Sequence, residues 1–225
     1  MKIFYSFTLF IFLLPGKIFS QGTSAKIFHL GRLNAEGILF DKEWMFYSDD
    51  NRDYGRIDYS AKNGVPVNPT LLLDQLPVVK HSGIGWFRLN LQVDSSLRNK
   101  TVGITLSMLG AAEMYLNGEQ VYQFGNVSTN YREETTQAIY MSALNLKLGN
   151  NEKQVLAIRY SYHPKNMYLK VGAIPNCLQV IMYPLNENTD YFALSVKRFF
   201  LFFGILLTIE FTSALLTLFF SFLFR

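Results

Sequence analysis

Apolar residues in the middle of the chain alternate with a period of two, which is typical of a strand with one buried face. Residues 83–93, GIGWFRLNLQV, show the pattern most clearly. It assigns two sets of side chains to opposite faces: Phe87, Leu89, Leu91 and Val93 on one, and Trp86, Arg88, Asn90 and Gln92 on the other. Similar runs occupy residues 101–109, 154–162 and 177–185. These segments predict short strands.

Turn signals separate the strands about every ten residues. Asn117-Gly118 joins two apolar runs, and Asn-Gly is the strongest short-range signal for a two-residue hairpin. Residues 146–154, LKLGNNEKQ, form a second predicted turn. No sustained helical repeat occurs between Ala25 and Asn186. We therefore expect an all-β fold, an antiparallel β-sandwich of the jelly-roll kind.

The two ends of the chain are strongly apolar. Residues 1–22 carry one lysine, an apolar run over 3–14 and small residues at Ser20 and Gly22, which is the layout of a signal peptide cleaved near Gly22. An uncleaved anchor is the alternative. Residues 199–224 would form a helix about 39 Å long, and they predict a transmembrane helix because a bilayer core is about 30 Å thick.

Glu210 lies near the middle of the predicted span. A carboxylate there packs against further membrane helices, or it is protonated, has no function and is tolerated by the bilayer. The first interpretation requires helices beyond Arg225, so we expect the chain to be the front part of a longer membrane protein or a truncated reading frame.

These patterns divide the chain into four parts: a signal peptide at 1–22, an extracytoplasmic β-sandwich at 23–186, a juxtamembrane linker at 187–198 and a transmembrane helix at 199–224. The segment 186–197, which crosses from the sandwich to the membrane, fits a last strand or a short amphipathic helix, and we prefer the helix. This division predicts a protein of the cytoplasmic (inner) membrane with its β domain in the periplasm.

Composition excludes several classes of function. Aromatic residues make up 16% of the chain and charged residues 17%, and the net charge of +4 is spread without a basic run. Disorder and nucleic-acid binding are therefore not expected. Cys177 is the single cysteine, so no internal disulfide can form, and we expect it to be a buried strand residue.

No catalytic motif is present. His29, His81 and His163 lack metal-ligand spacing, and no pair of acidic residues stands out as the two carboxylates of a glycosidase. Glu113 is expected to face solvent from a strand. We predict a protein that is not an enzyme and needs no cofactor.

A weak calcium candidate lies at Asp49, Asn51 and Asp53, whose oxygens alternate as in a calcium loop. Tyr54 and Ser60 stand where such a loop needs glycine and glutamate, so a solvated acidic turn is the favoured interpretation.

The best ligand candidates surround the loop 126–134, NVSTNYREE, and the end of the strand 154–162. They combine rings, an amide and charged groups, which suits a carbohydrate or another small polar ligand: Asn130, Tyr131, Arg132, Glu133, Tyr160, Tyr162 and His163. An ordinary polar loop is the alternative.

The order of several motifs resembles a galactose-binding-domain-like β-sandwich. The motifs are EWMFYSDDN at 43–51, LDQLP at 73–77, GIGWFRLNLQVDSSL at 83–97, LSMLGAAEMYLNGEQVYQFG at 106–125 and VLAIRYSY at 155–162. They are most similar to the periplasmic sensor domain of Bacteroidetes membrane signalling proteins, which include sensor histidine kinases and seven-transmembrane receptors. The sugar-binding domain of family 2 glycosidases is a more distant relation.

The resemblance implies a membrane-anchored sensing domain that binds a ligand and passes the signal to further transmembrane helices or a signalling partner. The alternative is an anchored carbohydrate- or protein-binding module with an adhesive or structural role. The residues that carry the motif have a plainer role in packing and in the hairpin: Trp44, Trp86, Tyr115, Asn117 and Gly118.

Overall fold

The computed structural model describes residues 26–80, 83–163, 177–185 and 191–223. The predicted signal peptide lies outside these residues, as do His81, residues 186–190 and Phe224. The described part of the chain contains ten strands: β1 (Ile27–Leu30), β2 (Ile38–Leu39), β3 (Trp44–Tyr47), β4 (Val65–Val67), β5 (Ile84–Val93), β6 (Thr101–Leu116), β7 (Glu119–Phe124), β8 (Gln137–Lys147), β9 (Lys153–Ser161) and β10 (Gln179–Pro184). The helical elements are η1 (Arg52–Gly55), η2 (Leu73–Gln75), α1 (Pro77–Lys80) and α2 (Tyr191–Leu223).

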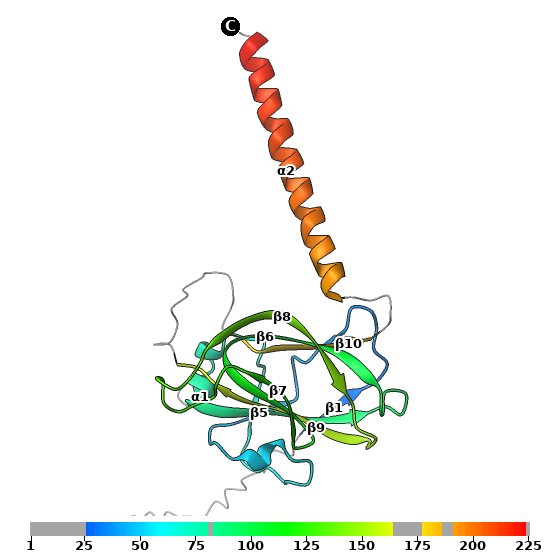
Figure 1. The fold of residues 1–225 in the computed structure, drawn as a ribbon, viewed down its shortest axis with the longest axis vertical. Coiled ribbons are helices and arrows are strands. Elements are labelled where there is room, and N and C mark those ends of the chain that lie inside the picture. The colour runs from blue at the N-terminus through cyan, green and yellow to red at the C-terminus, as the bar shows by residue number, and fades with distance from the viewer. Residues whose placement is uncertain (1–25, 81–82, 164–176, 186–190, 224–225) are drawn as a thin grey trace, which may run out of the picture.

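The strands form one curled sheet that folds into two layers (Figure 1). β6 belongs to both layers, because residues 101–110 pair with β8 while residues 111–116 pair with β9 and β7. The first layer continues from β9 through β5 to β3 and β4, and the second runs from β6 to β10 and β2. This mostly antiparallel arrangement is consistent with the predicted β-sandwich. β1 departs from it, since it pairs parallel with β5.

The main core lies between the two layers and contains the apolar face predicted for residues 83–93. Phe87, Leu89, Leu91 and Val93 are buried there, opposite side chains from β6 and β10. Tyr160 belongs to the same core, and its hydroxyl donates a 2.5 Å hydrogen bond to the Leu109 carbonyl. Period-two alternation therefore identified which face of β5 is internal.

The opposite face of the first layer is also covered. Trp86 is buried in a second small core with Tyr47, Tyr54, Tyr115 and Ala157, under the segment that contains η1. Arg88 is buried beside it and donates to three backbone carbonyls of this segment, those of Tyr54, Arg56 and Tyr59. Alternation alone predicted one exposed face, and it could not reveal a loop folded back over that face.

The predicted hairpin forms at Asn117-Gly118, between β6 and β7. Both residues have positive φ, 55° and 93°, as a primed two-residue turn requires. The Asn117 side chain accepts a 2.8 Å hydrogen bond from the Val155 amide, so the turn is fastened to β9. Trp44 is fully buried, and its indole donates to the Phe40 carbonyl at 2.8 Å. Cys177 is buried, as expected.

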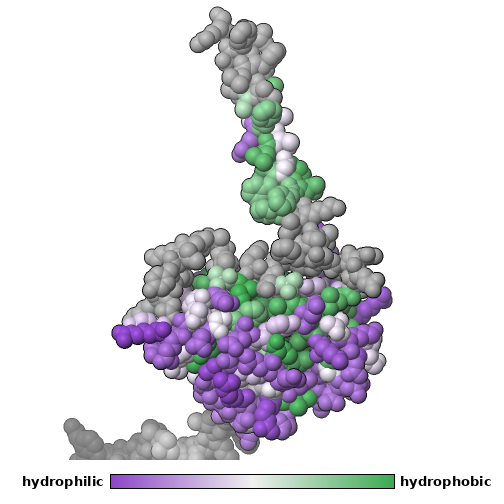
Figure 2. All heavy atoms as spheres, viewed as in Figure 1, coloured by the Kyte–Doolittle hydropathy of each residue, from purple (hydrophilic) through white to green (hydrophobic). Residues whose placement is uncertain are grey.

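α2 leads away from the sandwich (Figure 1) and begins at Tyr191, so the described part of the segment 186–197 is helical. Figure 2 shows hydrophobic side chains along it, whereas the visible face of the sandwich is largely hydrophilic. Phe200 and Phe211 are 68% and 67% exposed. The membrane span predicted for residues 199–224 is not found, since no helix among the described residues has the length and hydropathy needed to cross a membrane.

Candidate functional site

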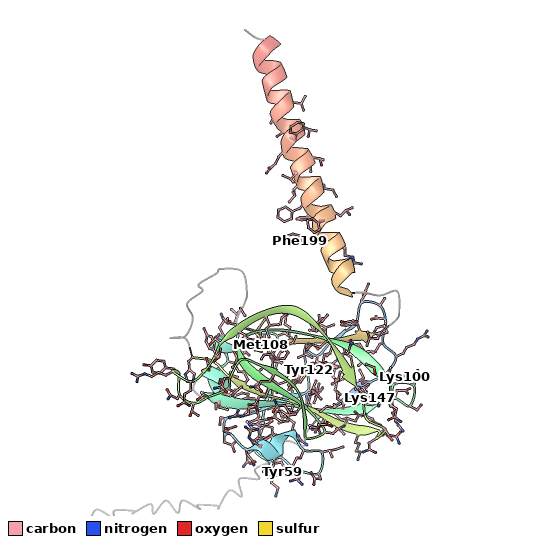
Figure 3. The ribbon with its side chains drawn as sticks, in the orientation of Figure 1. Tyr59, Lys100, Met108, Tyr122, Lys147 and Phe199 are labelled. Carbon is pink, nitrogen blue, oxygen red and sulfur yellow. The ribbon has the colours of Figure 1, made fainter. Side chains whose placement is uncertain are left out.

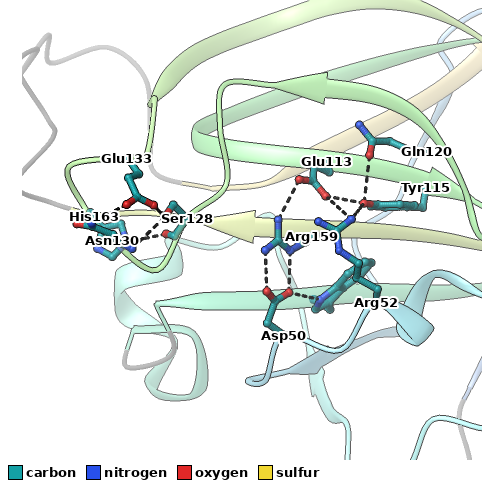
Figure 4. A network of polar contacts seen from close by, with 11 residues as sticks. Asp50, Arg52, Glu113, Tyr115, Gln120, Ser128, Asn130, Glu133, Arg159 and His163 are labelled. Atoms are coloured by element: carbon teal, nitrogen blue, oxygen red, sulfur yellow. Dashed lines mark hydrogen bonds and ion pairs between the residues drawn. The ribbon is translucent and has the colours of Figure 1, made fainter.

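Two polar groups of side chains lie on the outer face of the first layer (Figure 4). We call them the ionic cluster, which consists of Asp50, Arg52, Glu113, Tyr115 and Arg159, and the loop cluster, which consists of Ser128, Asn130, Glu133, Glu134 and His163. The strand register explains why they are neighbours. β9 presents Arg159 and Ser161 at alternate positions, and His163 follows two residues after its end. Arg159 pairs across the sheet with Trp86 of β5 and Glu113 of β6.

Arg159 is the centre of the ionic cluster. Its guanidinium donates two hydrogen bonds to Asp50, at 2.7 and 2.6 Å, and a third of 2.9 Å to Glu113. The side chains of Arg159 and Glu113 are only 8% and 9% exposed. The sequence prediction that Glu113 faces solvent was wrong, because the segment containing Asp50 covers this part of the sheet.

Asp50 and Arg52 bring the covering segment onto this pair. Asp50 also accepts from the Trp86 indole at 3.2 Å, and the hydrogen bonds from Arg159 lower the pKa of Asp50 below its usual range. Arg52 donates to the Tyr115 hydroxyl at 3.0 Å, and that hydroxyl donates to Glu113 at 2.5 Å. Burial, followed by this hydrogen bond, raises the pKa of Tyr115 to about 12. At neutral pH Asp50 is therefore ionised and Tyr115 is neutral.

The loop cluster is organised by Glu133. Its carboxylate accepts from Asn130 at 3.0 Å and from Ser128 at 3.2 Å, and the backbone of residues 126 and 135 closes the loop with a pair of hydrogen bonds. Asn130 accepts in turn from the Arg132 amide at 3.1 Å. These exposed polar groups are held in place before any ligand arrives.

Tyr131 and Arg132 form the outer part of the loop. The Arg132 guanidinium lies 5.6 Å from the centre of the Tyr131 ring and donates to the Tyr131 hydroxyl at 3.1 Å. Tyr131 is 39% exposed. A ring beside amide and charged groups can stack on the apolar face of a sugar while the polar groups bond its hydroxyls.

The structure brings His163 to this loop, as the sequence suggested. The His163 ring nitrogen Nε2 lies 3.0 Å from the Ser128 carbonyl and 3.6 Å from the buried Glu134 carboxylate, and the His163 amide donates to Glu134 at 3.2 Å. Tyr162 is half-buried against the main core. Tyr160 points into that core and is 4% exposed, so its ring does not reach the loop surface.

The side chains of the candidate calcium site form hydrogen bonds that stabilise the local fold. Asn51 caps η1 by accepting from the Asp53 amide at 3.0 Å, and Asp49 accepts from the Tyr54 hydroxyl at 2.8 Å. Burial and this second bond raise the pKa of Tyr54. Among the described residues, no group of three or more histidine, cysteine, aspartate or glutamate side chains is placed to hold a metal ion.

Sequence reasoning missed Asp50, Arg52, Arg88 and Arg159. Only a weak signal for these residues was present in the sequence. Arg88 and Arg159 each lie in a predicted strand, between apolar neighbours. Their partners are far away in the sequence, 109 residues in the case of Asp50 and Arg159, so only the strand register could join them.

No family model matches the chain, and no curated protein matches it. Solved structures of family 2 glycosidases are similar at low identity. The Bacteroides uniformis beta-glucuronidase has 16% identity and a TM-score of 0.43, over 65% of this chain and 18% of that one. A family 2 glycosyl hydrolase from Bacteroides cellulosilyticus gives 12% and 0.41, over 64% and 20%. The beta-glucuronidase from Ruminococcus gnavus gives 12% and 0.41, over 69% and 31%.

This chain thus spans less than a third of the length of each of these enzymes. The family named from the sequence as the more distant relation recurs in the comparison, but at these TM-scores the likeness carries no argument about the ligand. The resemblance to sensor domains stays a prediction.

Proposed function

We propose that this chain is a non-catalytic binding module for a carbohydrate, and that the loop cluster with Tyr131 and Arg132 contacts the ligand. The observation that carries the proposal is the preorganised surface around Glu133. Its carboxylate already holds Asn130 and Ser128, so binding a hydroxyl-rich ligand would cost little ordering of these side chains.

The ionic cluster supports a role without catalysis. A glycosidase needs one carboxylic acid with a raised pKa and a second carboxylate across a cleft. Asp50 and Glu113 instead share one guanidinium, and Arg159 lowers the pKa of Asp50. Such an acid is a poor proton donor at neutral pH. In this proposal the ionic cluster holds the segment with η1 in place.

A screen of the full chain on an array of immobilised oligosaccharides tests the proposal. We expect binding to at least one glycan, and we expect Glu133→Gln to weaken it about tenfold, because bonds to a charged acceptor are the stronger ones. Glu36→Gln is the matched control, since Glu36 is exposed in a turn away from the loop. An array on which the full chain binds no glycan would refute the proposal.

A second candidate, the membrane-tethered sensor, is favoured by α2. Its exposed side chains are large and apolar over several turns, including Phe199, Phe200 and Phe211, and such a surface needs a cover. In this candidate, lipid or further helices of a receptor cover α2, and ligand binding outside the membrane biases those helices. The β domain would then lie in the periplasm.

Fractionation of cells that express the full chain tests the second candidate. We expect the chain to sediment with the inner membrane and to resist extraction at alkaline pH, and we expect protease added to the periplasmic side to digest the sandwich. Recovery of the chain in the soluble fraction would contradict the membrane tether. The binding proposal would still be tested by the oligosaccharide array.

A further inference from the structure

A groove opens between β7 and β8, at the side of the sandwich away from β3 and β4. Its volume is about 530 Å³, which falls within the roughly 300–1,000 Å³ of pockets that hold small ligands. The two strands that border it each pair with β6, and neither has a second strand partner in the described part of the chain. The groove is separate from the loop cluster, because none of the five residues of that cluster lines it.

The groove has an apolar floor and an aromatic side. Leu116 and Leu146 are buried beneath it, and Val121 is half-buried beside them. The Tyr122 ring is half-exposed and stacks on Phe124 with ring centres 6.3 Å apart, which fixes its orientation. This floor and ring suit the apolar faces of a sugar ring.

Tyr122 also ties the two borders together. Its hydroxyl donates to the Asn145 carbonyl at 2.6 Å and accepts from the Asn145 amide at 3.1 Å. The ring is therefore fixed at both ends, and the width of the groove is set by a bond between β7 and β8. A site whose walls are already fixed loses little conformational entropy when a ligand binds.

Polar side chains line the rim. Glu119 supplies a carboxylate from the start of β7, where it pairs with Leu116, and Lys147 supplies a cation from the end of β8. Figure 3 shows Tyr122 and Lys147 on the two strands that border the groove. Glu119 and Lys147 are exposed, so they can reach a ligand without any rearrangement of the core.

Two other hollows are less suited to such a ligand. One, of about 250 Å³, is lined mainly by polar and charged groups such as Asp94, Arg98 and Glu152, and its described lining includes no Phe, Tyr or Trp ring. The other, of about 370 Å³, contains Trp44, but that indole is fully buried and already donates to the Phe40 carbonyl.

We infer that the groove between β7 and β8 is a second carbohydrate subsite, in which Tyr122 stacks on a sugar ring and Glu119 and Lys147 bond its hydroxyl groups. The inference rests on the proposed function, because it names a further contact surface for the same class of ligand.

The test uses the full chain and a glycan that it binds on the array. Glu119→Ala and Lys147→Ala are chosen in preference to a Tyr122 variant, because both side chains are exposed and their removal leaves the packing of Phe124 intact. We expect each variant to weaken binding about fivefold, the effect of one lost hydrogen bond to a ligand. Lys100→Ala is the matched control, since Lys100 is an exposed lysine that does not line the groove.

The outcomes separate the inference from the proposal beneath it. Binding that is unchanged in Glu119→Ala and Lys147→Ala but weakened in Glu133→Gln would overturn the groove and leave the loop cluster as the site. Weakening by Lys100→Ala to the same extent as by Lys147→Ala would also overturn it, because that result indicates a general charge effect. Absence of any glycan binding by the unmodified chain would overturn both.

Discussion

Replacing Arg159 by alanine is expected to lower the free energy of unfolding by about 3 kcal/mol, the lower end of the roughly 3–5 kcal/mol that follows when one partner of a buried ion pair is removed. The substitution leaves the buried Glu113 carboxylate with only the exposed Arg52 as a cation, and Asp50 loses two hydrogen bonds. The lower end applies because the Asp50 side chain is 36% exposed and can recover water. Urea unfolding at pH 7 measures the effect.

Arg52→Ala is the matched control for this prediction. Arg52 lies 3.6 Å from the same Glu113 carboxylate, but its side chain is 65% exposed, so its removal is expected to change the stability by less than about 1 kcal/mol. Equal losses in the two variants would contradict the assignment of Arg159 as the centre of the ionic cluster.

The pH dependence gives an independent check on Arg159. The pKa of Asp50 is lower in the folded protein than in the unfolded chain, where it is about 3.9. The ionised Asp50 therefore contributes its full stabilisation at pH values above the unfolded pKa. This stabilisation is lost as the pH falls through the lower pKa of the folded protein. The stability difference between the unmodified chain and Arg159→Ala should therefore narrow below about pH 4. A difference that stays constant from pH 7 down to pH 3 would contradict the ion pair.

Gly110→Ala is expected to destabilise the fold by about as much, about 3 kcal/mol, through strain and overpacking together. Gly110 lies where β6 passes from one layer to the other, and its φ of 136° is one that residues with a side chain rarely adopt. An added Cβ would lie 2.6 Å from the Ser161 carbonyl oxygen and 2.8 Å from the Tyr160 ring. Either the backbone of β6 at Gly110, where the strand passes between the layers, or the end of β9 would have to move.

Gly31→Ala is the control for the Gly110→Ala prediction. No atom lies within 4 Å of a Cβ placed at Gly31, and its φ lies outside the positive range, so a change within about 1 kcal/mol is expected. For a chain of this size, the loss at Gly110 corresponds to a fall in melting temperature of about 6–12 °C. Equal melting temperatures for the two variants would contradict the account of how one strand serves both layers.

The parts of the fold that the sequence predicted depend on neighbours along the chain. Alternation over residues 83–93 identified the buried face of β5, and Asn117-Gly118 identified the turn between β6 and β7, because both signals are set by local backbone geometry. The same reasoning grouped His163 with the loop 126–134, since the strand that carries it ends there.

The parts that it missed depend on contacts between distant segments. The parallel pairing of β1 with β5 joins residues about 63 positions apart, as in Ile27 with Asn90, and no local pattern specifies it. Glu113 was expected in solvent because the segment that covers it comes from before β4. Tyr160 was grouped with the ligand candidates because the sequence did not show which face of β9 points into the core. A shift by one residue exchanges the two faces of a strand.

The two clusters therefore have different roles in this account. The ionic cluster holds a covering segment on the sheet by buried charge pairs, and its effect is expected in stability. The loop cluster and the groove present exposed polar groups and rings, and their effect is expected in binding. The variants at Arg159 and Glu133 separate these roles, because the first should lower stability and the second should leave stability nearly unchanged.

The most direct measurement is the fate of a glycan incubated with the full chain. The glycan that binds best on the array is titrated calorimetrically, and it is then recovered and examined by mass spectrometry. We expect saturable binding that weakens about tenfold in Glu133→Gln, and a glycan recovered intact after prolonged incubation. Recovery of cleaved sugar would contradict the account of a binding module without catalysis.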